Sequence, residues 1–207
     1  QELVRRNFLS KKVLITGGSG VLGTSLKKVF KGAFCPTRKE MDISNPDSVN
    51  KAVSRYKPDT LIHTAALVGI RECEDNKEEA WLTNVEGTQN IVNALKKLNN
   101  NCYFVYMSTA CVFAGENEKY YTENDVPAPK NYYSVTKLCG EIVTRQYANS
   151  CIIRTNFAPK AQWRYPKSFT DRFGTYLFTD QVAEGINDVC KKKPKGSCWQ
   201  KTMSRKP

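Results

Sequence analysis

The segment TGGSGVLG, residues 16–23, constrains the fold of this chain more than any other stretch. An apolar run, Val13 to Thr16, precedes it and has the composition of a buried strand, while an amphipathic helical pattern follows it. A glycine-rich turn between a strand and a helix is the context in which dinucleotide-binding loops occur. The segment therefore predicts a strand–turn–helix unit that binds the phosphates of a dinucleotide. A glycine-rich turn without a ligand is the alternative.

Each glycine of the segment has a separate physical role in such a loop. Gly17 permits the tight turn, Gly20 lets the backbone approach a pyrophosphate, and Gly23 allows the helix to pack closely against the strand. The free amides at the helix N-terminus then face the phosphates. The spacing is Gly-x-x-Gly-x-x-Gly rather than Gly-x-Gly-x-x-Gly, so the prediction depends on the position of the segment as well as on its letters.

Strand and helix patterns alternate along the rest of the chain. We expect strands in AFCPTR, TLIHTAA, CYFVYMST and SCIIRTNF, and helices after Asn45-Pro46, over 76–100 with a break only at Gly87, over 133–147 and over 179–189. This order predicts an α/β fold, a doubly wound parallel sheet with helices on both faces. Residues 11–157 are predicted to form the dinucleotide-binding domain. Residues 158–207 are predicted to add a small substrate-side appendage and a basic tail, packed on the same domain.

The composition limits the classes of partner. The chain has 32 Lys and Arg residues against 20 Asp and Glu, a formal charge of +12, which attracts anions such as cofactor phosphates or a nucleotide-linked substrate. Aromatic residues do not alternate with arginines as in single-strand stacking platforms, so we expect no nucleic-acid partner. No apolar run reaches about 18 residues, so we expect no membrane span. The single histidine, His63, excludes a metal site built from several histidines, and its strand position favours a hydrogen-bonded core residue.

The eight cysteines include no Cys-x-x-Cys pair. Several lie inside apolar runs, where free thiols behave as small hydrophobic residues. We therefore expect reduced cysteines in a reducing compartment, which indicates a cytoplasmic location. The chain opens without an initiator Met and without a signal-peptide core, which leaves open whether residues precede Gln1.

The residues after the expected second strand bear on the choice of cofactor. An acidic residue there takes the ribose 2′-hydroxyl of NAD, whereas an arginine suits the 2′-phosphate of NADP. The segment CPTRKE presents Thr37, Arg38 and Lys39 ahead of Glu40. NADP(H) is therefore the preferred cofactor, and Glu40 keeps NAD(H) as the alternative. Asp42 and Ile43 could frame the adenine edge, or could simply precede a helix cap.

Seven motifs occur in an order that resembles the extended short-chain dehydrogenase/reductase family. They are TGGSGVLG, MDISNPDSV, PDTLIHTAALVGIRECE, TNVEGTQNI, MSTACVF, YTENDVPAPKNYYSVTKLCGE and CIIRTNF, and the resemblance extends over about residues 11–190. Within the family, the chain resembles sugar-nucleotide reductases of the dTDP-4-dehydrorhamnose reductase type. The resemblance implies a Rossmann fold and an NAD(P)-dependent oxidoreductase.

The resemblance also implies roles for individual residues. The catalytic Ser/Thr of the family falls on Thr109, its tyrosine on Tyr133 and its lysine on Lys137. The cofactor-binding positions fall on Gly17, Ser19, Gly20, Val21, Leu22, Gly23, Thr37, Arg38, Asp42, Ile43, Ala65, Ala66, Asn84, Tyr133, Lys137, Asn156 and Phe157. The substrate-binding positions fall on Thr109, Ala110, Cys111, Tyr133 and Phe157.

The chemistry of ketone reduction agrees with these residue types. Negative charge develops on the carbonyl oxygen, which needs a proton and hydrogen-bond donors. Tyr133 can supply the proton and Thr109 can hold the carbonyl. Lys137 lies four residues beyond Tyr133, on the same face of a helix, where its ammonium would lower the pKa of the tyrosine and bind the nicotinamide ribose. The predicted function is NADP-dependent reduction of a keto group on a nucleotide-linked deoxysugar.

Departures from the family pattern leave other functions open. The family normally carries a larger C-terminal region for the sugar nucleotide than the residues 158–207 that follow Phe157 here. In this region Arg164, Lys167 and Arg172 could bind a nucleotide diphosphate, or could be solvated charge. Cys111 resembles the acid/base cysteine of a relative that epimerises before it reduces, but no histidine follows His63 to pair with it.

Two alternatives to a reductase follow from the same resemblance. One is a non-catalytic NAD(P)-binding subunit, like the regulatory subunit of methionine adenosyltransferase. The other is a nucleotide-sugar epimerase or a dehydratase of the same family, although Ala110 and Cys111 stand where a dehydratase usually has an acidic pair. Family members often pair through the tyrosine-bearing helix, so a homodimer is a further expectation.

Overall fold

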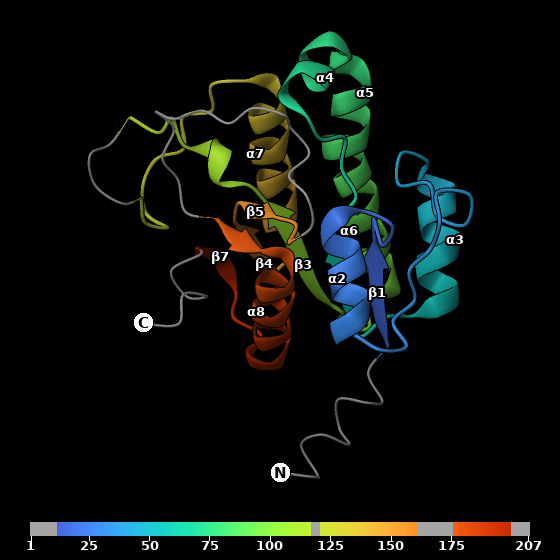
Figure 1. The fold of residues 1–207 in the computed structure, drawn as a ribbon. Helices are drawn as coiled ribbons and strands as arrows, with labels where there is room; N and C mark the ends of the chain where they lie inside the picture. The colour runs from blue at the N-terminus through green and yellow to red at the C-terminus, as the bar shows by residue number, and fades with distance from the viewer. Residues whose placement is uncertain (1–11, 117–120, 161–175, 200–207) are drawn as a thin grey trace.

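The chain forms a five-stranded sheet flanked by helices (Figure 1). The computed structural model describes residues 12–116, 121–160 and 176–199. The strands of the sheet are β1 (Val13–Thr16), β2 (Thr60–His63), β3 (Tyr103–Ser108), β4 (Ser150–Arg154) and β7 (Gly196–Trp199), and a separate two-stranded ladder joins β5 (Phe157–Ala158) to β6 (Leu177–Phe178). The helical elements are α2 (Val21–Val29), α3 (Pro46–Tyr56), α4 (Ile70–Asp75), α5 (Lys77–Trp81), the π-turn η1 (Leu82–Glu86), α6 (Gly87–Leu98), the 3₁₀ turn η2 (Ala110–Val112), α7 (Tyr132–Arg145) and α8 (Thr179–Lys192).

The sheet is parallel throughout, with its strands in the order β1-β2-β3-β4-β7. Its register aligns one residue from each of the first four strands: Ile15 pairs with Ile62, Ile62 with Val105, and Val105 with Cys151. Every residue of these four strands is buried, as expected when helices cover both faces of a parallel sheet. The predicted doubly wound α/β fold is confirmed.

The helices form two layers, one on each face of the sheet (Figure 1). Helices α2 and α8 pack against each other on one face, and α3, α6 and α7 follow one another on the opposite face. Successive side chains of a strand point to opposite faces, so Leu14 and Leu61 join the core under α3 and α6. Their neighbours Ile15 and Ile62 join the core under α2 and α8. These two cores fix the positions of the strand ends.

Helix α7 begins one residue earlier than the sequence pattern predicted. The side chain of Asn131 accepts a hydrogen bond from the amide of Ser134 at 2.9 Å, which is the usual way to satisfy a free donor of the first helical turn. The helix therefore runs from Tyr132 to Arg145. The predicted start of α3 at Asn45-Pro46 is confirmed.

The second strand expected in AFCPTR is wrong in its extent, because pairing there is limited to one bridge between Phe34 and Leu14. The amide of Phe34 donates to Val13, and its carbonyl accepts from Ile15. Pro36 follows two residues later and has no amide hydrogen to continue the ladder. The segment then turns, and the side chain of Glu40 accepts from the amide of Thr37 at 2.8 Å.

The break predicted at Gly87 is also wrong. Helix α6 begins at this glycine without an interruption, and the irregular part of the helical stretch is the π-turn η1 just before it. A Cβ atom at Gly87 would lie 3.1 Å from the side chain of Ile43. The glycine therefore serves close packing between α6 and the loop before α3, rather than a helix end.

The C-terminal part of the chain adds a strand that the sequence pattern did not indicate. Helix α8 begins at Thr179, as predicted, and continues to Lys192. Within the stretch expected to be a basic tail, β7 pairs with β4 so that Gly196 lies opposite Cys151. Gly196 adopts a φ of +88°, which a glycine accepts without strain.

The cysteines whose side chains the structure describes are free thiols: Cys35, Cys73, Cys102, Cys111, Cys139, Cys151 and Cys190. Four of them are buried, namely Cys73, Cys102, Cys151 and Cys190. Over the described parts of the chain, each helix is too short or too polar to span a bilayer.

Candidate active site

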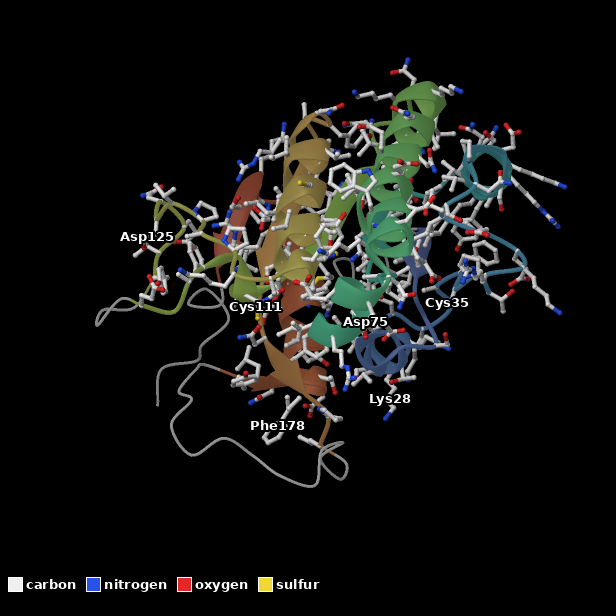
Figure 2. The ribbon with its side chains drawn as sticks, turned by 90° about the horizontal axis from the view of Figure 1, so that it is seen from above. Lys28, Cys35, Asp75, Cys111, Asp125 and Phe178 are labelled. Carbon is white, nitrogen blue, oxygen red and sulfur yellow. The ribbon has the colours of Figure 1, made fainter. Side chains whose placement is uncertain are left out.

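The loops that follow β1, β2, β3 and β4 surround a cavity of about 710 Å³ at the carboxyl edge of the sheet. Figure 2 views this edge from above, with Cys111 labelled on η2, which packs beside α7. Ligands of open parallel sheets bind at this edge. The predicted site residues that line the cavity are Gly17, Ser19, Gly20, Val21, Leu22, Gly23, Thr37, Arg38, Asp42, Ile43, Ala65, Ala66, Thr109, Cys111, Tyr133, Lys137, Asn156 and Phe157.

The glycine turn forms a cradle in which side chains would collide with backbone. Gly17 adopts a φ of +70°, and a Cβ atom there would lie 2.7 Å from the amide nitrogen of Ala65. A Cβ atom at Gly23 would lie 2.2 Å from the carbonyl oxygen of Gly17. Gly20 precedes α2 and has no side chain to cap it, so the first-turn amides, which lack intrahelical acceptors, are available to an anion. The turn therefore fits the diphosphate of a dinucleotide.

The CPTRKE segment contributes the cation of Arg38 to the cavity wall, and the carboxylate of Glu40 lies off that wall. Thr37 and Arg38 line the cavity, whereas Lys39 and Glu40 are absent from its wall. The carboxylate of Glu40 instead accepts hydrogen bonds from the amide and the hydroxyl of Thr37, at 2.8 and 2.9 Å, and these bonds lower the pKa of Glu40. Arg38 is 74% exposed and makes only a loose ion pair with Asp42, at 3.7 Å. This geometry fits a phosphate next to Arg38 better than a ribose hydroxyl next to Glu40.

Thr109, Tyr133 and Lys137 lie on the wall of the same cavity. Thr109 follows the last residue of β3, and its hydroxyl donates to Asn156 Oδ1 at 3.4 Å and accepts from the amide of Cys111 at 3.1 Å. Tyr133 lies in the first turn of α7, where its phenol is close enough to Thr109 for the two hydroxyls to interact. Lys137 lies one turn further along α7, with Nζ 4.2 Å from the ring centroid of Tyr106. The end of β3 thus brings the hydroxyl of Thr109 next to the phenol of Tyr133 on α7.

The electrostatics of this group differ from the sequence-based expectation. Burial raises the pKa of Tyr133 above its ordinary value, Cys111 and Cys73 raise it further, and the hydrogen bond with Thr109 acts in the opposite direction. Burial lowers the pKa of Lys137 from 10.5 to about 7, and Glu141 opposes that shift. The expected lowering of the tyrosine pKa by the ammonium is therefore wrong for the ligand-free site, because desolvation raises the pKa of the phenol and lowers that of the amine.

His63 is the hydrogen-bonded core residue that its strand position predicted. Its Nδ1 lies 2.7 Å from the hydroxyl of Thr16, and its Nε2 lies 3.2 Å from the hydroxyl of Thr88. Thr88 donates its own proton to the carbonyl of Asn84, so it can only accept from Nε2–H, and Thr16 must donate to Nδ1. Burial lowers the pKa of His63 to about 3, and the imidazole stays neutral.

Two predicted site residues, Asn84 and Ala110, do not line the cavity. Asn84 is buried, and its side-chain amide accepts from the amide of Leu67 and donates to the carbonyl of Leu67 and to the hydroxyl of Thr136. It therefore fixes the loop after β2 against α7 and supports the cavity wall from behind. Ala110 begins η2, one residue beyond Thr109.

The cavity wall also includes residues that the motifs did not indicate. They are Thr16, Pro36, Met41, Thr64, Leu67, Val68, Gly69, Ile70, Glu79, Thr83, Met107, Ser108, Thr155 and Tyr176. Thr64 and Thr155 directly follow strands, and Thr16 and Ser108 end them, so position at a carboxyl strand end was the signal that could have identified them. Residues such as Glu79 and Thr83 reach the cavity through the packing of their helices. No local sequence pattern predicts that packing.

The cations expected to bind a nucleotide diphosphate, Arg164, Lys167 and Arg172, lie outside the described residues. The described chain resumes at Tyr176, which lines the cavity and is 46% exposed. The ladder between β5 and β6 joins Phe157, which also lines the cavity, to Leu177, the residue after Tyr176.

Comparisons with known proteins agree on one family. A family model described as the RmlD substrate binding domain matches residues 11–193. The chain is 34% identical to the spore coat polysaccharide biosynthesis protein SpsK of Bacillus subtilis, over 70% of this chain and 53% of that protein. It is 31% identical to the dTDP-4-keto-6-deoxy-D-glucose reductase of Streptomyces niveus, over 87% and 62%. It is 30% identical to methionine adenosyltransferase 2 subunit beta of Rattus norvegicus, over 65% and 43%.

Solved structures give the same result. A dTDP-4-dehydrorhamnose reductase from Clostridium acetobutylicum superposes with a TM-score of 0.84 at 28% identity, covering 91% of this chain and 73% of that one. The dTDP-4-dehydrorhamnose reductase of Bacillus anthracis, solved in complex with NADP, gives a TM-score of 0.81 at 25% identity and covers 91% and 74%. The chain spans between 43% and 62% of the length of the three curated relatives.

Proposed function

We propose a reductase function for this chain, which belongs to the RmlD substrate binding domain family. Membership confirms the resemblance to sugar-nucleotide reductases of the extended short-chain dehydrogenase/reductase family. The proposed reaction is NADPH-dependent reduction of a keto group on a nucleotide-linked deoxysugar. Relatives named for dTDP-4-keto-6-deoxy-D-glucose and dTDP-4-dehydrorhamnose support that substrate class.

The observation that carries the proposal is the shared cavity. The glycine cradle, the exposed Arg38 and the group formed by Thr109, Tyr133 and Lys137 all line one space at the carboxyl edge of the sheet. A dinucleotide held by the cradle would lie next to a proton donor and a hydrogen-bonding hydroxyl. The neighbour solved with NADP supports the choice of cofactor.

The residues of the chain can perform the acid half of the reaction, and NADPH, when bound, supplies the hydride. Tyr133 is protonated before the reaction because burial raises its pKa, so it can donate a proton to the carbonyl oxygen. Thr109 would give a second hydrogen bond to that oxygen. Lys137 in its charged form would stabilise the negative charge that proton donation leaves on the Tyr133 oxygen.

A direct assay tests the proposal. The chain is mixed with NADPH and a panel of 4-keto-6-deoxy nucleotide sugars, and the absorbance of the reduced nicotinamide is followed. We expect oxidation of NADPH that depends on one or more of these sugars. NADPH binding without turnover on any sugar would contradict the reductase proposal.

That second outcome would favour a non-catalytic cofactor-binding subunit. The 30% identity to methionine adenosyltransferase 2 subunit beta supports this candidate. The presence of Thr109, Tyr133 and Lys137 around the cavity argues against it. Size-exclusion chromatography with candidate catalytic partners would then be the next measurement.

Arg38→Ala is expected to reduce the preference for NADPH. A hydrogen bond to a charged group contributes about 1.5–3 kcal/mol, and the exposure of Arg38 places its effect at the low end. We expect the Kd for NADPH to rise about tenfold and the Kd for NADH to stay unchanged, as measured by fluorescence titration. Lys39→Ala, next to it but off the cavity wall, is the matched control. An equal loss for both cofactors would remove Arg38 from the 2′-phosphate site.

A further inference from the structure

We propose that Glu141 is a positioning residue of the reductase site: its carboxylate acts on the amine of Lys137 one helical turn away and ties together the three elements that carry the catalytic group. The inference rests on the proposed reductase function, because it assigns a role within the same site. Glu141 itself does not line the cavity, so it would act through Lys137, Ser108 and Arg154.

The spacing along α7 places Glu141 in line with the two catalytic residues of the helix. Tyr133, Lys137 and Glu141 follow one another at intervals of four residues, which stacks their side chains on one helical face. That face is turned into the protein, since Lys137 is 4% exposed and Glu141 is 1% exposed. A carboxylate with so little water around it interacts strongly with a charge one turn away.

The hydrogen bonds of Glu141 reach both strands that end at the catalytic group. Oε1 accepts from the hydroxyl of Ser108 at 2.5 Å and from Nε of Arg154 at 2.9 Å, and Oε2 accepts from Nη2 of Arg154 at 2.6 Å. Ser108 is the last residue of β3 and directly precedes Thr109. Arg154 is the last residue of β4 and lies two positions before Asn156. One carboxylate therefore connects α7 to the strand ends that position Thr109 and Asn156.

Most other titratable groups near Lys137 are neutral or exposed. Tyr106 on β3 has a raised pKa and His63 on β2 a pKa of about 3, both because of burial. The pKa of Tyr133 on α7 and of Cys73 on α4 is raised by burial as well. Two further charged groups are the exposed carboxylate of Glu79 on α5, which lines the same cavity, and the buried guanidinium of Arg154 on β4, which is paired with Glu141. Among the described residues that surround Lys137, Glu141 is thus the buried anion that opposes desolvation of the amine.

Stability alone does not explain the buried pair between Glu141 and Arg154. Burying two charges costs much of what their attraction returns, and well-packed apolar residues of similar volume often stabilise a core equally well. Nη1 of Arg154 is also buried without a hydrogen-bond partner among the described residues. A role of the Glu141 carboxylate in acting on Lys137 would explain why the protein keeps a buried ion pair that is costly to desolvate.

The double substitution Glu141→Met with Arg154→Met separates this role from a structural one. It removes both charges together and leaves no unpaired ion in the core. The readout is the titration of Lys137 in the ligand-free protein, followed by NMR of isotope-labelled lysine side chains and assigned with a Lys137→Met sample. We expect the variant to fold and its Lys137 midpoint to move to lower pH by about one unit, a tenfold change in the protonation constant. The exposed Glu184→Gln is the control and should leave the midpoint in place.

Single substitutions test the direction in which the Lys137 midpoint moves. Glu141→Gln removes the carboxylate charge and should lower the Lys137 midpoint, whereas Arg154→Met leaves the carboxylate unpaired and should raise it. The alkaline limb of the pH profile of kcat/KM should move in the same direction as the midpoint in each variant that folds. An unchanged Lys137 midpoint in the double variant would overturn the inference. Absence of turnover by the unmodified chain would instead refute the reductase function, and the NMR titration would still decide whether Glu141 sets the charge of Lys137.

Discussion

Replacing Tyr133 with phenylalanine is expected to lower kcat for NADPH-dependent sugar reduction by about 10²–10⁴-fold, the usual contribution of a positioned general acid. The substitution removes one oxygen and leaves the ring of the first turn of α7 in place. Without the phenol, the developing charge on the carbonyl oxygen has only the hydroxyl of Thr109 as a protein donor. The measurement is the rate of NADPH oxidation at saturating sugar, together with the Kd for NADPH.

The neighbouring tyrosine provides a matched control for this loss. Tyr132 lies off the cavity wall, and its amide donates to the carboxylate of Glu74. Tyr132→Phe therefore makes the same chemical change one residue away and should retain activity within about twofold, because the hydroxyl that it removes belongs to a residue off the cavity wall and the ring stays in place. Tyr133→Phe should bind NADPH with nearly unchanged affinity, which separates loss of acid catalysis from loss of the cofactor site. Full activity in Tyr133→Phe would remove the tyrosine from the mechanism.

Local sequence patterns predicted the parts of the fold that depend on local chemistry. The strand at Val13–Thr16, the turn at Gly17 and the cap at Asn45 follow from hydrophobic runs, backbone freedom and side-chain hydrogen bonds within a few residues. Residues far apart in the chain were assigned to one site by the resemblance to the reductase family. The structure gives the physical reason for their proximity, because parallel strands bring their carboxyl ends to one edge.

Features that depend on distant parts of the chain could not be predicted in this way. Strand β7 forms because β4 offers a free edge to Gly196 and its neighbours, which nothing in a lysine-rich segment indicates. The buried ion pair joins Glu141 to Arg154 across two elements, and each residue alone resembles an ordinary surface charge. Burial of Lys137 also reverses the electrostatic argument that its spacing from Tyr133 suggested, because desolvation depends on everything packed around the amine.

Replacing Lys137 with methionine is expected to reduce kcat about a hundredfold or more while increasing stability at neutral pH. The loss of activity follows because the charge on the Tyr133 oxygen would have no nearby cation, and removing one such electrostatic contact typically costs 10²–10³-fold. The gain in stability follows because Lys137 is 4% exposed and folding must desolvate it. Methionine has a similar length, and it fills the space beside the ring of Tyr106 without a charge.

The pH dependence gives this prediction a definite sign. Burial lowers the pKa of Lys137 from 10.5 in the unfolded chain to about 7 in the folded protein, so between these values the unfolded state binds more protons. The free energy of unfolding of the unmodified protein therefore rises with pH across this window, by up to about 1.4 kcal/mol per pH unit. It is highest above 10.5 and is lost as the pH falls towards 7. Lys137→Met lacks this pH-dependent contribution to the free energy of unfolding. Its stability advantage over the unmodified protein should therefore be greatest near pH 7 and shrink by pH 10. Urea unfolding of both proteins at several pH values measures the difference, and an advantage that stays constant with pH would show that the folded protein does not depress the lysine pKa.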